Sequence, residues 1–359
     1  MLTCGSFDAV ETFYAATLSH LYEHVRTADL QNPLFVRTIT EEPRHGSLVK
    51  HCAWSIEMTL YERADGGLYP SPSKHRQVLD DVLSLLKCFQ NLKSLSITYG
   101  LTYKSSEVPA DTVTEEPTSF FPTTEQLQAI SFSHLESLRI TDNSKYTAAR
   151  PYLASHFHKA LEKTKSAREW SEALSPWPLL HWFRTACRIK SLALEKFDFR
   201  DSAVMKKRGW KGLERVIIHQ PKCTSNEEHL LAVFLQPLKE LKHLIFNFTT
   251  DQNVGYEFLC QAFLMDVAMA QLTTLRLVDV LPFPDEVPEP FAKMFPLVTD
   301  FTLIQTYFQW DLVEFIKSLF PDDVPCPRLE RMNWSIFERY PGFRFRGAPP
   351  IRSLLQSFT

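Results

Sequence analysis

The chain has 359 residues, of which 44% are hydrophobic and 23% charged, and its formal net charge at pH 7 is −3. This composition is typical of a folded protein and excludes a largely disordered chain. The small net charge gives no global attraction for nucleic acid or an anionic membrane, so we expect neither as a partner. The seven cysteines are widely spaced and form no C-x-x-C, which favours a reduced intracellular protein over a disulfide framework or a zinc site.

The N-terminus predicts a helix rather than a targeting signal. It has neither a basic region nor an apolar signal core, and no apolar run reaches the ~18 residues of a membrane span, so we expect a cytoplasmic or nuclear protein. Asp8 and Glu11 form a capping-box pattern, and apolar residues then follow at helical spacing, which predicts a helix over 8–27. We assign residues 1–45 to an N-terminal helical segment and 46–359 to a second, repetitive domain.

A short apolar phrase recurs through the second domain. It reads apolar, two spacers, apolar, one spacer, apolar, as in "NLKSLSI" (91–97), "HLESLRI" (134–140) and "RIKSLAL" (188–194). Its apolar anchors are Leu92/Leu95/Ile97, Leu135/Leu138/Ile140, Ile189/Leu192/Leu194, Leu213/Val216/Ile218, Leu241/Leu244/Phe246, Leu272/Leu275/Leu277, Val298/Phe301/Leu303 and Leu329/Met332/Trp334. Weaker copies stand at Val49/Cys52/Trp54 and Ile351/Leu354.

Each copy of the phrase predicts one short strand, because its last two anchors alternate with polar residues. Segments with helical periodicity lie between copies, at 75–89, 226–238, 255–269 and 311–320. Strand–helix units at steps of 24 to 31 residues after residue 189, and 43 to 54 before it, indicate an α/β solenoid of parallel strands with helices on the outer side. An ordinary α/β sandwich is the alternative, since its buried parallel strands also read as short apolar runs.

Two segments interrupt the repeats. Residues 101–124 are rich in Ser, Thr, Pro and Glu, which predicts a flexible loop. Residues 144–187 have helical periodicity and account for the step of 54 residues, so we expect a helical insert there.

The repeated phrase resembles the leucine-rich repeat, L-x-x-L-x-L-x-x-N. Only Leu135 to Asn143 matches fully, and elsewhere the asparagine position holds other residues, Phe197 and Pro221 among them. Such irregular repeats are similar to those of the F-box/leucine-rich-repeat proteins of filamentous fungi. The phrase "LYEHV" (21–25) also resembles the end of the last F-box helix in that family, whereas the earlier F-box helices have no counterpart here.

The resemblance implies a non-catalytic substrate receptor of a cullin–RING (SCF) ubiquitin ligase, with a truncated or missing F-box. A Skp-family adaptor would then contact the N-terminal helix, and the repeats would hold an unknown protein target. The residues we expect on the adaptor side are Phe13, Tyr14, Leu18, Leu21 and Tyr22. The alternative is a stand-alone repeat scaffold with no role in ubiquitin transfer, in which the helix caps the solenoid.

No signature of a catalytic class is present, since the chain lacks G-x-S-x-G, G-x-x-x-x-G-K-[ST], G-x-G-x-x-G and H-E-x-x-H. His156 and His158 form an H-x-H, but on a helix their side chains point about 200° apart. We therefore expect no enzyme, no cofactor and no metal site.

The strand residues that point away from the core offer a binding surface, because a solenoid leaves that side of its strands uncovered. Counted from the first apolar anchor of each phrase, they occupy the third, fifth and seventh positions. They combine spaced arginines with exposed aliphatic residues, as protein-docking surfaces do. The residues we expect to bind the target are Arg139, Arg215, Ile217, Ile245, Arg276, Ile304, Arg331 and Asn333.

Overall fold

The structure is a computed structural model of the chain. It describes residues 16–62, 68–70, 72–104, 122–143, 177–197, 199, 210, 212–221, 228–235, 237–248, 271–279, 291–305, 320 and 328–336. The strands are β1 (His24–Val25), β2 (His51–Glu62), β3 (Leu68–Pro70), β4 (Ser94–Lys104), β5 (Ser137–Asp142), β6 (Ser191–Glu195), β7 (Arg215–His219), β8 (His243–Asn247), β9 (Thr274–Val278), β10 (Asp300–Gln305) and β11 (Arg331–Ile336). The helices are α2 (Thr27–Leu30), α3 (Pro33–Glu41), α4 (Pro43–Gly46), α5 (Pro72–Leu86), α6 (Thr124–Gln128), α9 (Trp177–Ala186), α10 (Glu228–Leu235) and α12 (Phe291–Met294).

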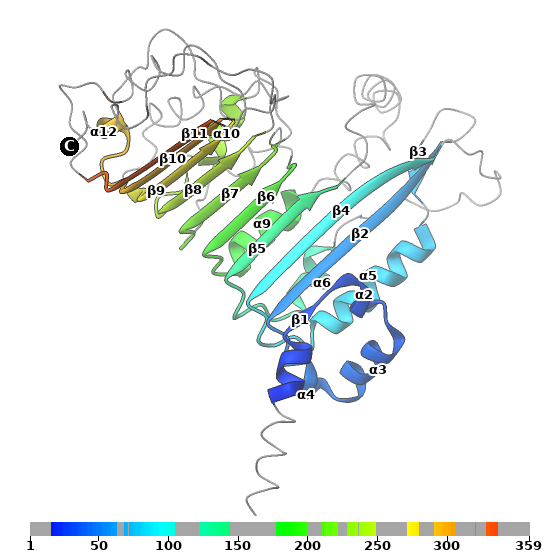
Figure 1. Ribbon diagram of the computed structural model, residues 1–359. Coiled ribbons are helices and arrows are strands. Elements are labelled where there is room, and N and C mark those ends of the chain that lie inside the picture. The colour runs from blue at the N-terminus through cyan, green and yellow to red at the C-terminus, as the bar shows by residue number, and fades with distance from the viewer. Residues whose placement is uncertain are drawn as a thin grey trace, which may run out of the picture.

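All described strands belong to one 11-stranded sheet, in the order β1-β2-β4-β5-β6-β7-β8-β9-β10-β11, with β3 paired to β2 (Figure 1). Every neighbouring pair along that path is parallel, and only β2 with β3 is antiparallel. The spatial order of the parallel strands equals their order in the chain, so successive connections all advance in one direction. This α/β arrangement is compatible with a solenoid, and a doubly wound sheet would instead reverse its strand order at a switch point.

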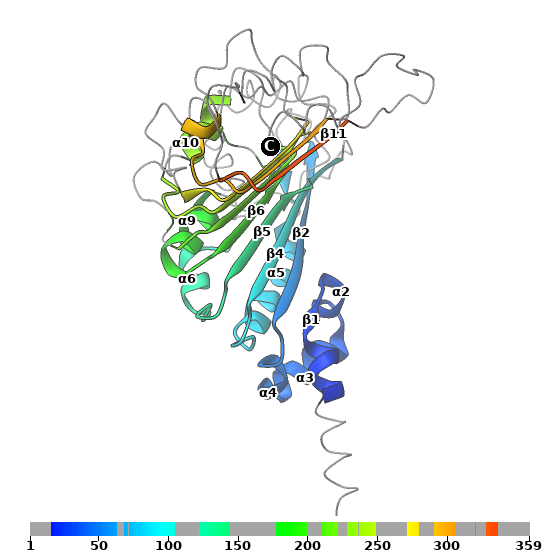
Figure 2. The ribbon, with the colours of Figure 1, turned by 60° about the vertical axis from the view of Figure 1, so that its left-hand side comes forward.

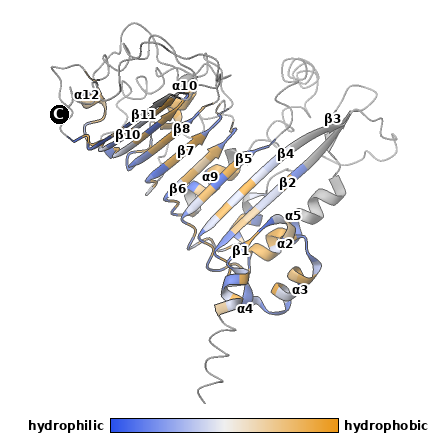
Figure 3. Ribbon diagram, viewed as in Figure 1, coloured by the Kyte–Doolittle hydropathy of each residue, from blue (hydrophilic) through white to orange (hydrophobic). Residues whose placement is uncertain are grey.

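The repeated phrases pair in register, as predicted. Leu138 pairs with Leu95 on one side and with Leu192 on the other, and the same column continues through Val216 to Met332 on β11. The weaker copy at Val49, Cys52 and Trp54 joins this column, because Cys52 pairs with Leu95. Figure 3 shows hydrophobic and hydrophilic residues alternating along the strands. This alternation determines which face is buried, because a slip of one residue would turn every anchor toward solvent.

The core lies between the sheet and the helices on one side of it, α5, α6, α9 and α10 (Figures 1 and 2). Buried helix residues such as Leu86, Phe183 and Leu235 belong to the same hydrophobic cluster as the strand anchors. Phenylalanines supply much of this core, with Phe199 packing edge-on against both Phe197 and Phe234. These helices leave the opposite side of the strands uncovered.

A column of charged residues lies where strands β2 and β4 to β8 begin, at the first spacer of their phrases, and Glu23 extends it to the start of β1. Lys190 pairs with Glu136 at 2.9 Å, Lys242 with Glu214 at 3.1 Å, and Lys50 with Glu23 at 3.0 Å. In the backbone, the carbonyl of each of these residues accepts hydrogen bonds from two successive N–H groups of the next repeat; for example, Glu136 accepts from Lys190 and Ser191. The column therefore aligns the start of each strand with the next.

The backbone turns in the same way directly after three of the strands. Lys196, Gln220 and Asp279 directly follow β6, β7 and β9, and all three have φ near +50°, the left-handed region (φ 52°, 48° and 53°). Lys196 and Gln220 each donate a backbone hydrogen bond to the last residue of the next strand, at 2.7 and 2.6 Å. This turn sends the chain off the sheet toward the helical side, where Phe197 and Pro221 are buried. The asparagine position of the phrase therefore holds a core residue in these repeats.

The N-terminal helix ends earlier than predicted. Residues 16–22 are helical, but His24 and Val25 then form β1 and pair with His51 and Cys52. The prediction of a helix through residue 27 was wrong at this end, because backbone hydrogen bonding to the exposed edge of β2 outweighs helical periodicity. Residues 8–15 lie outside the described part of the chain.

Other expectations hold only in part. Residues 101–104 continue β4 and pair with Met58 to Tyr61 of β2, so any loop begins after them. The helices expected at 75–89 and 226–238 are α5 and α10. The expected insert of 144–187 is described only from residue 177, where α9 is helical. The helices expected at 255–269 and 311–320, and the phrase at Ile351, fall on residues that are not described, apart from Phe320, which is buried.

Candidate functional site

The strand residues on the uncovered side of the sheet form what we call the open face. Five of them make a straight row across five strands, Arg139, Ala193, Ile217, Ile245 and Arg276, each in register with the next. The row exists because these residues occupy the same position, the fifth, in consecutive phrases. Residues at alternate positions of a strand point to the same face, so matching positions of neighbouring strands meet there.

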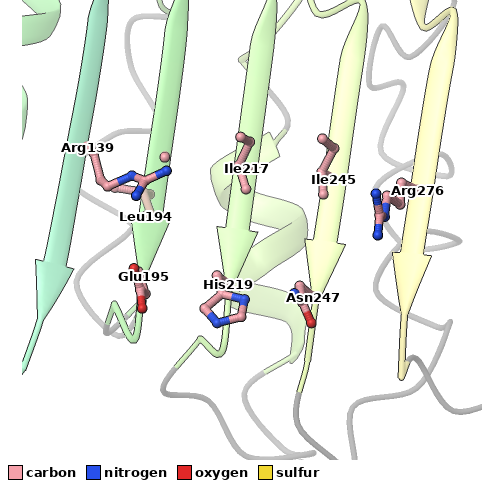
Figure 4. A pocket seen from close by; sticks show the side chains of 9 residues that line it. Arg139, Leu194, Glu195, Ile217, His219, Ile245, Asn247 and Arg276 are labelled. Carbon is pink, nitrogen blue, oxygen red and sulfur yellow. The ribbon is translucent and has the colours of Figure 1, made fainter. Parts of the chain in front are cut away.

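This row lines a groove with a volume of about 370 Å³. Figure 4 shows Ile217 and Ile245 side by side in the middle, with the side chains of Arg139 and Arg276 leaning inward from the two ends. Nearer the carboxyl ends of the strands, a second row is formed by Glu195, His219 and Asn247. The groove therefore combines an aliphatic floor, a cation at each end and one polar side.

The structure brings together only some of the predicted target-binding residues. Arg139, Ile217, Ile245 and Arg276 line the groove. Arg215 is exposed at the start of β7, on the same face, and does not line it. Ile304 is half-buried on β10, and Asn333 is exposed on β11. Arg331 is engaged by Asp300, with 3.0 Å between Nη2 and Oδ2.

The groove residues that were missed as site residues include three polar ones, Glu195, His219 and Asn247. They occupy the seventh position of their phrases, so the repeat pattern placed them on the open face without ranking them. They are distinguished by lying next to the central row of the groove. This closeness can be recognised only once the register of the paired strands is known. Within the described residues, the Glu195 carboxylate accepts a hydrogen bond from Thr141 Oγ1 at 3.3 Å.

The N-terminal helices carry a second surface. Leu21 and Leu34 are the large hydrophobic residues that stand exposed in the described part of the chain, at 68% and 73%. Leu21 directly precedes Tyr22, and Leu34 directly precedes Phe35. The rings of Tyr22 and Phe35 pack against each other with centroids 5.9 Å apart. Tyr22 also stacks on His45 at 5.4 Å, so its ring is partly buried. We call the exposed Leu21 and Leu34 the leucine pair.

Of the predicted adaptor-side residues, the structure therefore leaves Leu21 exposed and packs Tyr22 inward. Leu18 is half-buried, and Phe13 and Tyr14 lie outside the described residues. Leu34 was missed as a site residue, because the predicted helix ended at residue 27. The signal for α3 was Asn32-Pro33: the Asn32 side chain accepts a hydrogen bond from Leu34 N at 3.0 Å, and proline begins the helix.

One cluster of side chains has the donor types of a metal site. The ligand atoms of Glu23, His24 and His51 lie within 4.8 Å of one another. The imidazole rings of His24 and His51 are stacked, however, with centroids 4.5 Å apart and planes at 11°, so their nitrogen lone pairs do not converge. Lys50 donates a hydrogen bond to Glu23 at 3.0 Å and thereby lowers the pKa of that carboxyl. A metal ion would have to unstack the rings and displace Lys50.

Two described cysteines are poor nucleophiles. Burial, with a smaller contribution from the charge of Asp29, raises the pKa of Cys52 to about 12, and burial raises that of Cys187 to about 12. A thiol reacts as the thiolate, so these side chains act as core residues.

Within the described residues, no helix combines the length and apolar character that crossing a membrane requires.

Comparison with known proteins adds no assignment. No protein-family model matches the chain, and no curated protein matches it significantly in sequence. The function must therefore be inferred from the open face and the leucine pair.

Proposed function

We propose that the chain is a non-catalytic receptor of irregular leucine-rich repeats, whose open face binds a protein target while its N-terminal helices attach it to a Skp-family adaptor of a cullin–RING ubiquitin ligase. The observation that carries the proposal is the open face itself. A row of in-register residues, aliphatic in the centre and cationic at both ends, lies on the side of the sheet that the helices leave uncovered. Such a surface suits protein recognition.

The leucine pair supports the adaptor half of the proposal. The described part of the chain buries dozens of hydrophobic side chains, yet Leu21 and Leu34, both on the N-terminal helices, remain in water. Burying a leucine side chain contributes roughly 1.5–3 kcal/mol, so covering both would favour a complex. The resemblance of "LYEHV" to the end of an F-box helix indicates the Skp family as the class of partner.

A second candidate is a stand-alone scaffold in which the N-terminal helices serve as a cap. One observation favours it: Val25, Leu30 and Ile39 are buried in the same core as the strand anchors. β1 and α2 also cover part of the β2 edge, because Ser55 N donates to Thr27 Oγ1 at 2.8 Å. Capping and adaptor binding use different residues, so the two functions can be separated by mutation.

The test is co-elution of the purified chain with a Skp-family adaptor from the same source in size-exclusion chromatography. We expect a stable complex, and we expect Leu21→Asp with Leu34→Asp to abolish it. Gln31→Asp, which adds one negative charge at an exposed polar position of the same segment, is the control and leaves the complex intact; each single leucine variant, Leu21→Asp or Leu34→Asp, adds the same charge as this control. A folded chain that forms no complex would overturn adaptor binding and leave the scaffold.

A further inference from the structure

The groove has two arginines that no described residue pairs with. Within the described residues, the side chains of Arg139 and Arg276 make no ion pair or hydrogen bond, although Arg331 on the same face is paired with Asp300. Two lysines of the charged column are paired as well, Lys190 with Glu136 and Lys242 with Glu214. Two arginines at the ends of one groove therefore keep their full capacity to bind carboxylates, in a chain whose net charge is −3.

The floor between these arginines is apolar. Ala193, Ile217 and Ile245 are half-buried, and they follow one another in register on β6, β7 and β8. Adjacent β-branched side chains make a continuous aliphatic strip across the strands. A ligand that fills this groove must bring apolar groups to its centre and negative charge to both ends.

We propose that the groove binds an extended acidic segment of the target protein, with one carboxylate on Arg139, one on Arg276 and aliphatic side chains between them on Ile217 and Ile245. The inference rests on the proposed function and specifies the chemistry of the target. Arginine is suited to this role, because its planar guanidinium binds a carboxylate through two parallel hydrogen bonds.

The register sets the spacing of the two acidic residues. Arg139 is on β5 and Arg276 is on β9, four strand spacings apart, which is roughly 19 Å at ~4.8 Å per spacing. An extended chain advances ~3.3 Å per residue, so the two carboxylates are about six residues apart in the bound segment. The inward lean of both arginines shortens this separation (Figure 4).

The second row favours a peptide over a nucleic acid. The Glu195 carboxylate lies on the polar side of the groove, where it would repel a chain of phosphates. Among the described residues, the floor is aliphatic and holds no Phe, Tyr or Trp on which bases stack. Beside an extended peptide, by contrast, Glu195, His219 and Asn247 are positioned to hydrogen-bond its backbone amides and carbonyls.

The experiment measures fluorescence anisotropy of labelled synthetic peptides with the full chain. The probes carry two glutamates separated by roughly four to eight residues, with two leucines between them and glycine and serine elsewhere. Matched probes replace both glutamates by lysine, or both leucines by serine. We expect the Glu–Leu probes to bind best at a separation of about six residues or slightly fewer and to weaken as salt rises, while both matched probes bind at least tenfold more weakly.

Variants locate the binding. We expect Arg139→Gln with Arg276→Gln to weaken the best probe by about tenfold or more, because each removes a charged hydrogen-bonding partner. Arg331→Gln is the matched control, since this arginine on the same face is already paired, and it leaves affinity unchanged. Ile245→Ser also weakens binding, and thermal melts of all variants verify that they fold.

The inference is overturned if no Glu–Leu probe binds, if the lysine probes bind equally well, or if Arg331→Gln weakens binding as much as the groove variants. None of these variants touches the leucine pair, so adaptor co-elution is measured on the same samples. Loss of peptide binding with intact co-elution rejects the acidic segment alone. Peptide binding without co-elution rejects the adaptor and retains the groove.

Discussion

His24 and His51 face each other across the junction between the N-terminal helices and the rest of the sheet, with their imidazole rings stacked 4.5 Å apart at an angle of 11°. They are register partners on β1 and β2, the two strands that join these parts. Burial lowers the pKa of His51, and the neighbouring His24 lowers it further. Protonation of His51 therefore weakens the junction, because it places a partly desolvated charge against the stacked ring of His24.

The first prediction is that acid loosens this junction. A histidine whose pKa is lowered by folding binds fewer protons in the folded chain than in the unfolded chain, so stability falls as the pH drops below its ordinary pKa of 6.5. We expect the melting temperature to decrease between about pH 7.5 and pH 5.5. We also expect the protection factor of the Val25 amide, which corrects its exchange rate for the intrinsic slowing of exchange in acid, to fall. His51→Gln should reduce this pH dependence, while His219→Gln, on the open face, should not. Equal pH dependence in both variants would contradict the assignment to His51.

The charged column predicts a specific effect of reversing Lys190. Glu136 and Glu214 flank this lysine, and the hydrogen bond to Glu136 raises the pKa of Lys190 while lowering that of Glu136. We expect Lys190→Glu, which places three carboxylates in succession, to lower the urea midpoint more than Lys190→Gln does. The double variant Lys190→Glu with Glu136→Lys should recover part of the lost urea midpoint. Added salt should bring the midpoints of the three variants closer to that of the unchanged chain. A Lys190→Glu variant as stable as Lys190→Gln would show that the column contributes no alignment energy.

The strand anchors should be the most sensitive positions of the chain. Leu192 is completely buried between Leu138 and Val216, its partners in the column of anchors. Truncating a leucine in such a site costs about 2–5 kcal/mol, so we expect Leu192→Ala to lower the free energy of unfolding by that amount. Ser191→Ala, one residue earlier and facing away from the core, should change it by less than ~0.5 kcal/mol. Urea titrations followed by circular dichroism measure both, and equal effects would be incompatible with the buried column.

Gly46 tests how the N-terminal helices attach to α5. A Cβ at this position would lie 2.6 Å from the carbonyl oxygen of Cys88 and 2.8 Å from its Cβ, which is too close without backbone movement. We expect Gly46→Ala to cost roughly 1–3 kcal/mol and to lower the melting temperature. At Gly100 the nearest atom would be 3.6 Å away, so Gly100→Ala should be close to neutral. If both substitutions are tolerated equally, α4 does not pack this tightly against the end of α5.

The repeat phrases made the sheet predictable. Leu95, Leu138 and Leu192 share one place in the phrase, and that place alone predicted that they pair and are buried. β1 was not predictable from its own residues, because His24-Val25 is two residues long and becomes a strand only where β2 offers an edge. The extension of β4 through Lys104 was missed for the same reason, since Leu101 to Lys104 pair with a partner more than forty positions earlier in the chain.

The binding surface was likewise predictable from the sequence only in part. By itself, the sequence determined which residues point away from the core, because alternation along a strand is a local property. Only the tertiary structure decided that Arg139 and Arg276 stand at the two ends of one groove without an ion pair among the described residues, while Arg331 on the same face is neutralised by Asp300. It likewise decided that Leu21 remains in water while Tyr22 packs against Phe35 and His45. The physical reason is that exposure and charge pairing depend on neighbours supplied by distant segments, whereas the strand pattern depends only on the residues beside it.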